Sequence, residues 1–208
     1  MDKIDAVYYI NLEYRTDRKQ EFLEWIHESG FPESKLHRIQ AVHTPERGHI
    51  GCLLSHVKTL EIFLESSFSN CIIFEDDYMP LQLEGFWNHF SELFSSGKEF
   101  DLVMCSYNVL KSEETDVPFL RKVHESFTTS GYLITRNLAK VLMEHWKETI
   151  RLALEEEERT RMKTHTYTAD VSWQKLMPHY KWYCFYPRIG IQRPSFSDLQ
   201  GHYTNYNA

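Results

Sequence analysis

The chain has 208 residues, of which 42% are hydrophobic and 14% aromatic. This supplies the apolar core of one substantial domain, so we expect a single domain over residues 1–208. The formal charge of −7 at pH 7 argues against broad electrostatic binding to nucleic acid, which usually needs a basic face.

The hydropathy of the chain and its cysteine content predict its cellular compartment. No apolar run approaches the ~20 residues of a membrane-spanning helix, and the opening residues MDKIDAVYYI lack the pattern of a secretion signal. The four cysteines are scattered, without the spacing of a zinc site or the density of a disulfide scaffold. We expect reduced, mostly buried thiols and a cytoplasmic chain without a transmembrane segment, compatible with further domains in a longer protein.

The first third of the chain predicts two strand and helix units. Residues 4–12 are almost continuously apolar, as in a strand that is covered on both faces. Thr16 is predicted to cap the following helix, and Gly30 marks its end. A short strand over 36–42 and a helix over about 50–64, with apolar residues at helical spacing, repeat the unit.

The middle of the chain continues the alternation. Residues 71–74 (CIIF) form a short apolar strand that runs directly into the acidic residues 75–77. A helix is expected over 86–93 and a buried strand over 100–107, whereas residues 108–117 carry few apolar side chains and predict an exposed loop.

In the last part, a strand over 131–135 precedes a helix over about 137–146. The charged run 155–161 (EEEERTR) indicates a solvated helical face or a mobile loop, to which we assign no function. A short helix over 169–177 leads into aromatic strand material over 180–192. Alternating strands and helices predict an α/β fold with a mainly parallel central sheet flanked by helices.

The acids Glu75, Asp76 and Asp77 follow a buried strand. Open α/β sheets bind ligands at the carboxyl ends of their strands, where loops form a crevice. Three adjacent acids repel one another, and a bound cation relieves this repulsion. Carboxylate oxygens suit magnesium or manganese, whose remaining positions can be filled by phosphate oxygens. The alternative is an exposed acidic turn on the surface.

Short blocks along the chain match one known family pattern. They are residues 7–12 (VYYINL) with Arg15 and Arg18, 48–56 (GHIGCLLSH), 72–77 (IIFEDD), 130–134 (SGYLI), and 187–192 (PRIGIQ) with Ser195, Ser197 and Asp198. In this order they resemble glycosyltransferase family 25, which includes lipooligosaccharide glycosyltransferases and collagen galactosyltransferases. Each block alone is weakly specific, but the ordered set covers most of the chain.

The resemblance implies a GT-A-like fold, a Rossmann-like nucleotide-binding sandwich. It also implies a UDP-sugar donor, Mn²⁺ or Mg²⁺ held by a motif similar to Asp-x-Asp, and inverting transfer to a glycan or glycosylated protein. Galactose or glucose is favoured. Because the motif begins with glutamate here, we assign the metal chiefly to Asp77 and place Glu75 near the ribose or a metal-bound water. Gln192 fits a second metal ligand by position and His202 by chemistry.

The donor site is predicted to include residues near the first strand and in the second helix. Arg15 and Arg18 can contact uracil or phosphate through planar hydrogen bonds, or they are exposed arginines at a helix start. His56 has packing or hydrogen bonding as its alternative role, and at ~10 Å from His49 along a helix it shares no metal with that residue. The predicted donor-binding set is Asn11, Leu12, Arg15, Arg18, Ser55, His56, Glu75 and Asp76.

Asp170 is the predicted catalytic base, because it heads a late helix as catalytic acids do in many inverting GT-A enzymes. Its alternative role is helix capping. Asp76 or Asp198 would then be the base to test. Two other functions stay open: a metal-dependent phosphohydrolase, whose usual nucleophile would be an aspartate where the chain has Glu75, and a non-catalytic module that binds sugar nucleotides.

Overall fold

The computed structural model describes residues 1–162, 166–197 and 202–205. Its centre is one sheet of eight strands in the order β2-β1-β3-β8-β5-β9-β7-β6. The strands of this sheet are β1 (Ala6–Asn11), β2 (Leu36–Gln40), β3 (Asn70–Glu75), β5 (Leu102–Met104), β6 (Asn108–Glu114), β7 (Leu120–Phe127), β8 (Gly131–Thr135) and β9 (Trp182–Phe185).

The sheet is mixed. The pairs β1–β2, β1–β3 and β5–β9 are parallel, whereas β7 and β8 run antiparallel to each of their neighbours. Strands β1, β2 and β3 form the parallel part, and β1 and β3 have the continuous apolar sequences that predicted it. The predicted α/β class is confirmed, and the antiparallel strands β8 and β7 make the sheet mixed rather than wholly parallel.

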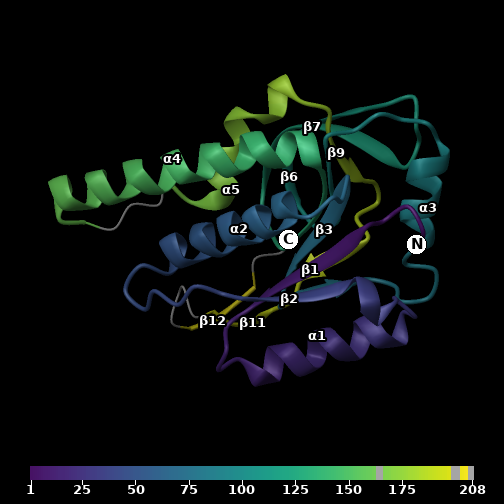
Figure 1. Cartoon of the computed structure of the whole chain (residues 1–208). Coiled ribbons are helices and arrows are strands. Elements are labelled where there is room, and N and C mark those ends of the chain that lie inside the picture. Colours follow the sequence, from purple (N-terminus) through teal and green to yellow (C-terminus); the bar gives the residue numbers. More distant parts are fainter. Residues whose placement is uncertain (163–165, 198–201, 206–208) are drawn as a thin grey trace.

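Helices cover both faces of the sheet (Figure 1). In β1, Val7 packs in the same cluster as Phe22 of α1, whereas Tyr8 packs with Leu53 of α2, because successive strand side chains point to opposite faces. One layer contains α1 (Thr16–Glu28) and α3 (Asn88–Ser95), and the other contains α2 (Gly48–Glu65), α4 (Arg136–Thr160) and α5 (Ala169–Ser172).

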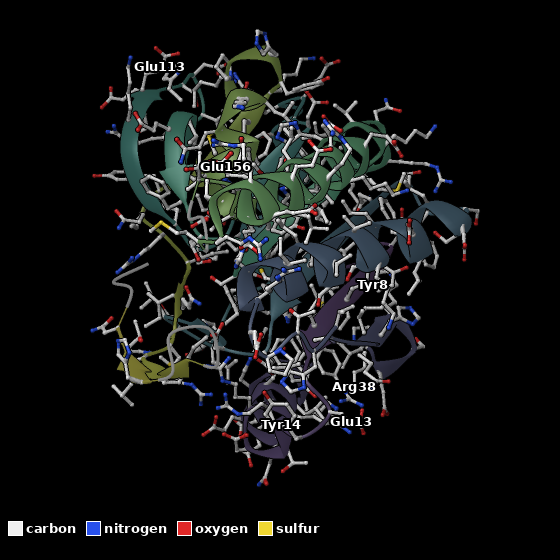
Figure 2. All side chains as sticks on the ribbon, turned by 90° about the vertical axis from the view of Figure 1, so that its left-hand side faces the viewer. Tyr8, Glu13, Tyr14, Arg38, Glu113 and Glu156 are labelled. Atoms are coloured by element: carbon white, nitrogen blue, oxygen red, sulfur yellow. The ribbon has the colours of Figure 1, made fainter. Side chains whose placement is uncertain are left out.

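The prediction of an exposed loop over residues 108–117 is wrong. Residues Asn108–Glu114 form β6, which pairs with β7 as an antiparallel hairpin at the edge of the sheet. Edge strands tolerate charged side chains because one side is open to solvent, so this strand lacks the apolar signal that marks the central ones. Figure 2 shows Glu113 of β6 at the opposite end of the molecule from Tyr14.

Two predicted helix features are also corrected. Helix α1 begins at Thr16, but its N-cap is Arg15 and no side chain caps it, so Thr16 is the first helical residue and not the cap. The short late helix ends at Ser172 and continues as two 3₁₀ turns, η2 (Trp173–Lys175) and η3 (Met177–His179). One further 3₁₀ turn, η1 (Glu33–Lys35), precedes β2.

The charged run 155–161 lies mostly on the last exposed turns of α4, which is longer than predicted. Glu157 is an exception, since its side chain is buried. Its carboxylate lies 3.0 Å from Arg47 Nε and 3.0 Å from His49 Nε2. One acid of the run therefore joins the end of α4 to the beginning of α2.

A small antiparallel ladder lies beside the end of β3. It pairs β4 (Tyr78–Pro80) with β10 (Gly190–Gln192), with Gln192 opposite Tyr78. A Cβ atom at Gly190 would lie 2.1 Å from Tyr78 Oη, so only glycine lets the two strands approach with the tyrosine ring between them. This ladder brings Gln192 to Asp77. A second ladder pairs β11 (Ser195–Ser197) with β12 (His202–Thr204).

The thiols follow the prediction. All four cysteines are free; Cys71, Cys105 and Cys184 are buried, and Cys52 is half-buried. Among the residues that the structure describes, no helix has both the length and the apolar composition needed to cross a bilayer.

Candidate functional site

A cavity of about 670 Å³ lies at the carboxyl ends of β1 and β3. Its walls come from these strand ends, the first turns of α2, the connection between β7 and β8, the start of α5 and the end of β10. The acids 75–77 line it together with Asp170 and Gln192. Segments that are far apart in the sequence thus place five oxygen-bearing side chains around one space.

Asp76 and Asp77 are buried, with 6% and 5% of their surfaces exposed, so the alternative of an exposed acidic turn is wrong. Arg18 Nη1 lies 3.0 Å from Asp76 Oδ1 and 3.0 Å from Asp77 Oδ2. Its Nη2 donates a hydrogen bond to Ser195 Oγ at 2.7 Å. The guanidinium therefore relieves part of the repulsion that the sequence assigned to a cation.

Asn11 holds Asp76 from the side of β1. Asn11 Nδ2 donates to Asp76 Oδ2 at 2.6 Å, and Asn11 Oδ1 accepts from Arg38 Nη2 at 2.8 Å. Arg38 also pairs with Glu13 at 3.0 Å, and Figure 2 shows these two side chains near Tyr14. Two elements, β1 and β2, thus fix the orientation of Asp76.

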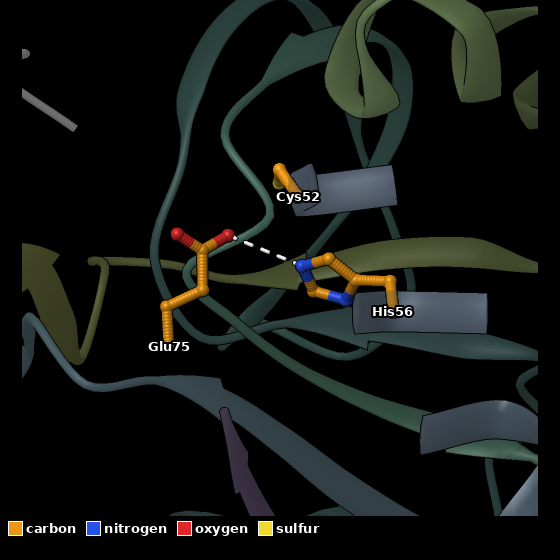
Figure 3. A group of neighbouring side chains, drawn as sticks. All are labelled: Cys52, His56 and Glu75. Atoms are coloured by element: carbon orange, nitrogen blue, oxygen red, sulfur yellow. Dashed lines mark hydrogen bonds and ion pairs between the residues drawn. The ribbon is translucent and has the colours of Figure 1, made fainter. Parts of the chain in front are cut away.

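Glu75 makes different contacts from the two aspartates. Its Oε1 accepts a hydrogen bond from Thr129 Oγ1 at 2.6 Å and lies 3.2 Å from His56 Nε2 (Figure 3). His56 Nδ1 lies 3.0 Å from Tyr132 Oη. Burial raises the pKa of Glu75, but the hydrogen bond and charge of His56 and the hydrogen bond of Thr129 outweigh it, so the net pKa is lowered. The alternative of a hydrogen-bonding role for His56 agrees with these contacts.

Asp77 is the carboxylate that is least satisfied by its surroundings. Burial and the charge of Glu75 raise its pKa to about 7, although Arg18 opposes the shift. Its Oδ1 is buried and has no hydrogen-bond partner among the described residues. A buried carboxylate oxygen of this kind is stabilised by a proton or by a cation.

A chain of hydrogen bonds links Asp77 to Asp170. Gln192 Nε2 donates to Asp77 Oδ2 at 3.3 Å, and Thr128 Oγ1 donates to Gln192 Oε1 at 3.1 Å. The backbone N–H of Thr128 donates to Asp170 Oδ2 at 3.3 Å, and Thr168 Oγ1 donates to Asp170 Oδ1 at 2.8 Å. No side chain caps α5, so the capping alternative for Asp170 is wrong.

Thr128, in the middle of this chain, has a strained backbone. Its φ is 74°, a left-handed conformation that is a genuine outlier for a β-branched residue. Such strain persists where surrounding contacts over-determine it and is concentrated at functional sites. Thr128 and Thr129 were not among the predicted site residues, because a Thr-Thr pair carries no sequence signal of a role before the fold brings it to the cavity.

The remaining residues of the predicted donor-binding set differ in their distance from the cavity. Leu12 lines the cavity, whereas the guanidinium of Arg15 is bonded to Asp17 at 2.9–3.0 Å and is absent from the lining. Ser55 Oγ accepts from the N–H of Val42 at 2.8 Å and thereby ties α2 to the end of β2.

Two predicted residues near the C-terminus are not brought to the site. His202 is exposed on β12 and does not line the cavity. Asp198, the reserve candidate for the base, lies outside the described residues.

The cavity lies at the carboxyl ends of the strands of an α/β sandwich, the usual place of a ligand site in such folds. A family model described as glycosyltransferase family 25 (LPS biosynthesis protein) matches residues 33–157. The chain belongs to this family and is a glycosyltransferase. The predicted membership is confirmed.

Solved structures are similar to the chain at low identity. One is a glycosyltransferase involved in the glycosylation of the major capsid of PBCV-1, with 8% identity over 94% of this chain and 95% of that one, at a TM-score of 0.50. Another is A197 from STIV, with 12% identity, coverage of 91% and 94%, and a TM-score of 0.46. An apo UDP-glucose pyrophosphorylase has 7% identity, coverage of 86% and 72%, and a TM-score of 0.48. No curated protein matches the chain.

Proposed function

We propose that this glycosyltransferase moves galactose or glucose from a UDP-sugar to a hydroxyl group of a glycan or glycosylated protein, with inversion. The family description, which refers to LPS biosynthesis, supports a glycan acceptor. The observation that carries the proposal is the buried Oδ1 of Asp77, which lacks a hydrogen-bond partner among the described residues in the wall of a cavity that also contains Asp170.

The residues around Asp77 fit a divalent cation. Asp77 and Gln192 carry the carboxylate and amide oxygens that Mn²⁺ and Mg²⁺ prefer. Gln192 Nε2 donates to Asp77 Oδ2 and Gln192 Oε1 accepts from Thr128 Oγ1, so metal binding requires the amide to turn its oxygen toward Asp77. When bound, such a cation neutralises the departing diphosphate. We choose Gln192 over His202 as the second ligand, because His202 is exposed and outside the cavity lining.

Donor binding in this proposal uses the residues near the end of β1. Leu12 and Arg18 line the cavity, and Arg18 carries the positive charge that a diphosphate needs. Asn11 and Ser55 act one step further away, since they hold Asp76 and the backbone of Val42. Arg15 joins the site only if its pair with Asp17 opens on donor binding.

Asp170 would take the proton from the acceptor hydroxyl as that oxygen attacks the anomeric carbon. Its two carboxylate oxygens each accept a hydrogen bond, from the N–H of Thr128 and from Thr168 Oγ1. These donors fix the orientation of the carboxylate that would act as the base. The hydrogen bonds through Thr128 and Gln192 fix the position of Asp170 relative to the proposed metal ligand Asp77.

The test is incubation with manganese and a panel of UDP-sugars, with UDP and inorganic phosphate measured separately. We expect UDP release that stops when a chelator is added and grows when an acceptor glycan is present. Release of phosphate would indicate a phosphohydrolase. Release of neither product would indicate a module that only binds sugar nucleotides. The cytoplasmic location stays a prediction.

A further inference from the structure

The wall of the cavity that α2 forms carries a second group of ligand atoms. Cys52, His56 and Glu75 each offer one such atom, and all three atoms lie within 4.8 Å of one another (Figure 3). Cys52 and His56 are four residues apart on α2 and therefore share a face of the helix. Glu75 reaches them from the end of β3.

Two of the three side chains are already oriented. His56 is buried and its Nδ1 lies 3.0 Å from Tyr132 Oη. Histidines that bind metals almost always donate their other ring N–H to an oxygen, which fixes the tautomer and the ring plane. Thr129 Oγ1 donates to Glu75 Oε1 at 2.6 Å. The outer contacts that a metal site needs are therefore present before a metal binds.

The spacing is close to that of a tetrahedral ion. Zinc bonds of ~2.0–2.3 Å place neighbouring ligand atoms about 3.3–3.8 Å apart. His56 Nε2 and Glu75 Oε1 are separated by 3.2 Å, and no atom pair of the group exceeds 4.8 Å. A small rotation of the side chains brings all three atoms within bonding range of one cation.

We infer that Cys52, His56 and Glu75 form a binding site for a cation of the zinc class, distinct from the oxygen site at Asp77. Thiolate and imidazole ligands select zinc over manganese and magnesium. Three protein ligands leave a fourth position for water or a ligand, and this position is accessible because all three residues line the cavity. The inference stands independently of the proposed function.

The test uses the purified chain, freed of metal, with Co²⁺ as a spectroscopic probe and Zn²⁺ as its competitor. We expect a thiolate-to-cobalt charge-transfer band that Zn²⁺ removes and that is lost in Cys52→Ser. Tyr132→Phe should weaken Zn²⁺ binding about 10–100-fold, the usual effect of losing an outer partner. No band in the unaltered chain, or a band that persists in Cys52→Ser, would overturn the inference.

Matched variants separate this site from the rest of the cavity. His43→Asn, which changes a cavity histidine outside the group, should bind cobalt as the unaltered chain does. Asp77→Asn should keep the cobalt band even where it loses manganese, so the two sites fail independently. If Cys52→Ser does not fold, thiol labelling of the unaltered chain decides: Zn²⁺ should protect Cys52 from the reagent, and unchanged labelling of Cys52 would refute the site.

Discussion

Two walls of the same cavity hold their carboxylates in opposite ways. On one wall, Asp76 and Asp77 share the positive charge of Arg18. On the other, Glu75 is held by the imidazole of His56 and the hydroxyl of Thr129. The three acids are consecutive, but Glu75 is the last residue of β3 whereas Asp76 and Asp77 lie in the turn that follows, so the two aspartates are not oriented by the strand that orients Glu75. Three consecutive acids therefore line two different walls of the cavity and do not form a single set of ligands.

The different surroundings of the two walls shift the pKa values of Asp77 and Glu75 in opposite directions. Burial raises the pKa of Asp77 to about 7, because one arginine shared with Asp76 does not offset the loss of water and the charge of Glu75. Burial also acts on Glu75, yet its pKa is lowered, since His56 and Thr129 bond directly to the carboxylate. The Asp77 wall is short of positive charge, and the Glu75 wall is already satisfied by hydrogen bonds.

The largest expected effect comes from Asp77→Ala. This change removes the carboxylate that lacks compensation, so manganese-dependent binding of UDP-sugars should be lost while the chain stays folded. Calorimetric titration with and without chelator measures the loss. Glu24→Ala removes an exposed acid of α1 outside the cavity and serves as the control. UDP affinity that survives in Asp77→Ala and still responds to chelator would assign the metal elsewhere.

The variant Asp170→Asn tests whether Asp170 is the carboxylate that accepts the proton of the acceptor hydroxyl. The amide keeps the size of the side chain but is not a base at neutral pH, so turnover should fall roughly 10²-fold or more with donor affinity near normal. Single-turnover transfer and a melting curve on the same variant measure both properties. Normal turnover would remove Asp170 from the mechanism and leave Asp76 or Asp198 to be tested as the base.

Gly190→Ala should disturb the Asp77 wall alone. The added methyl group meets Tyr78 Oη at 2.1 Å, and overpacking of this kind costs about 1–3 kcal/mol. The β4–β10 ladder carries Gln192 to Asp77, so manganese affinity should fall along with the melting temperature. The cobalt band at Cys52 should remain. Loss of the band together with manganese binding would show that the two walls are coupled.

The metal-free chain should also show a pH dependence of its stability. The pKa of Asp77 rises from 3.8 in the unfolded chain to about 7 in the folded one. Stability linked to this group is therefore complete below about pH 4 and is lost as the pH rises through 7. Asp77→Asn has no carboxylate to ionise at this position, so it does not lose this stability. The difference in melting temperature between Asp77→Asn and the unaltered chain should therefore grow between about pH 5 and pH 8. It should grow by about 2–4 °C for each kcal/mol of stability that the unaltered chain loses.

The melting curves also contain their own control. Because manganese replaces the proton on Asp77, adding it at pH 8 should stabilise the unaltered chain and leave Asp77→Asn unchanged. A melting difference that does not vary with pH would show that the carboxylate of Asp77 is ionised in both the folded and the unfolded chain.

The sequence alone determined the parallel part of the sheet and the position of the acids. Residues 4–12 and 71–74 are buried on both faces, and such strands must be apolar throughout, which is visible without a structure. The edge strand β6 was not visible, because an edge is half solvated and its sequence resembles a loop. The blocks 48–56, 72–77 and 130–134, read from the sequence, all lie within residues 33–157 that the family model matches.

Only the tertiary structure decided which side chains meet. Arg18 and Ser195 are 177 residues apart in sequence yet in contact, and the pairing of Gln192 with Asp77 depends on a ladder of three-residue strands too short to predict. The division of the acidic triplet between Arg18 and His56 likewise depends on how α1 and α2 pack on opposite faces of the sheet. Sequence patterns report the periodicity of one element, whereas a site is made of contacts between elements, and these exist only after the layers have packed.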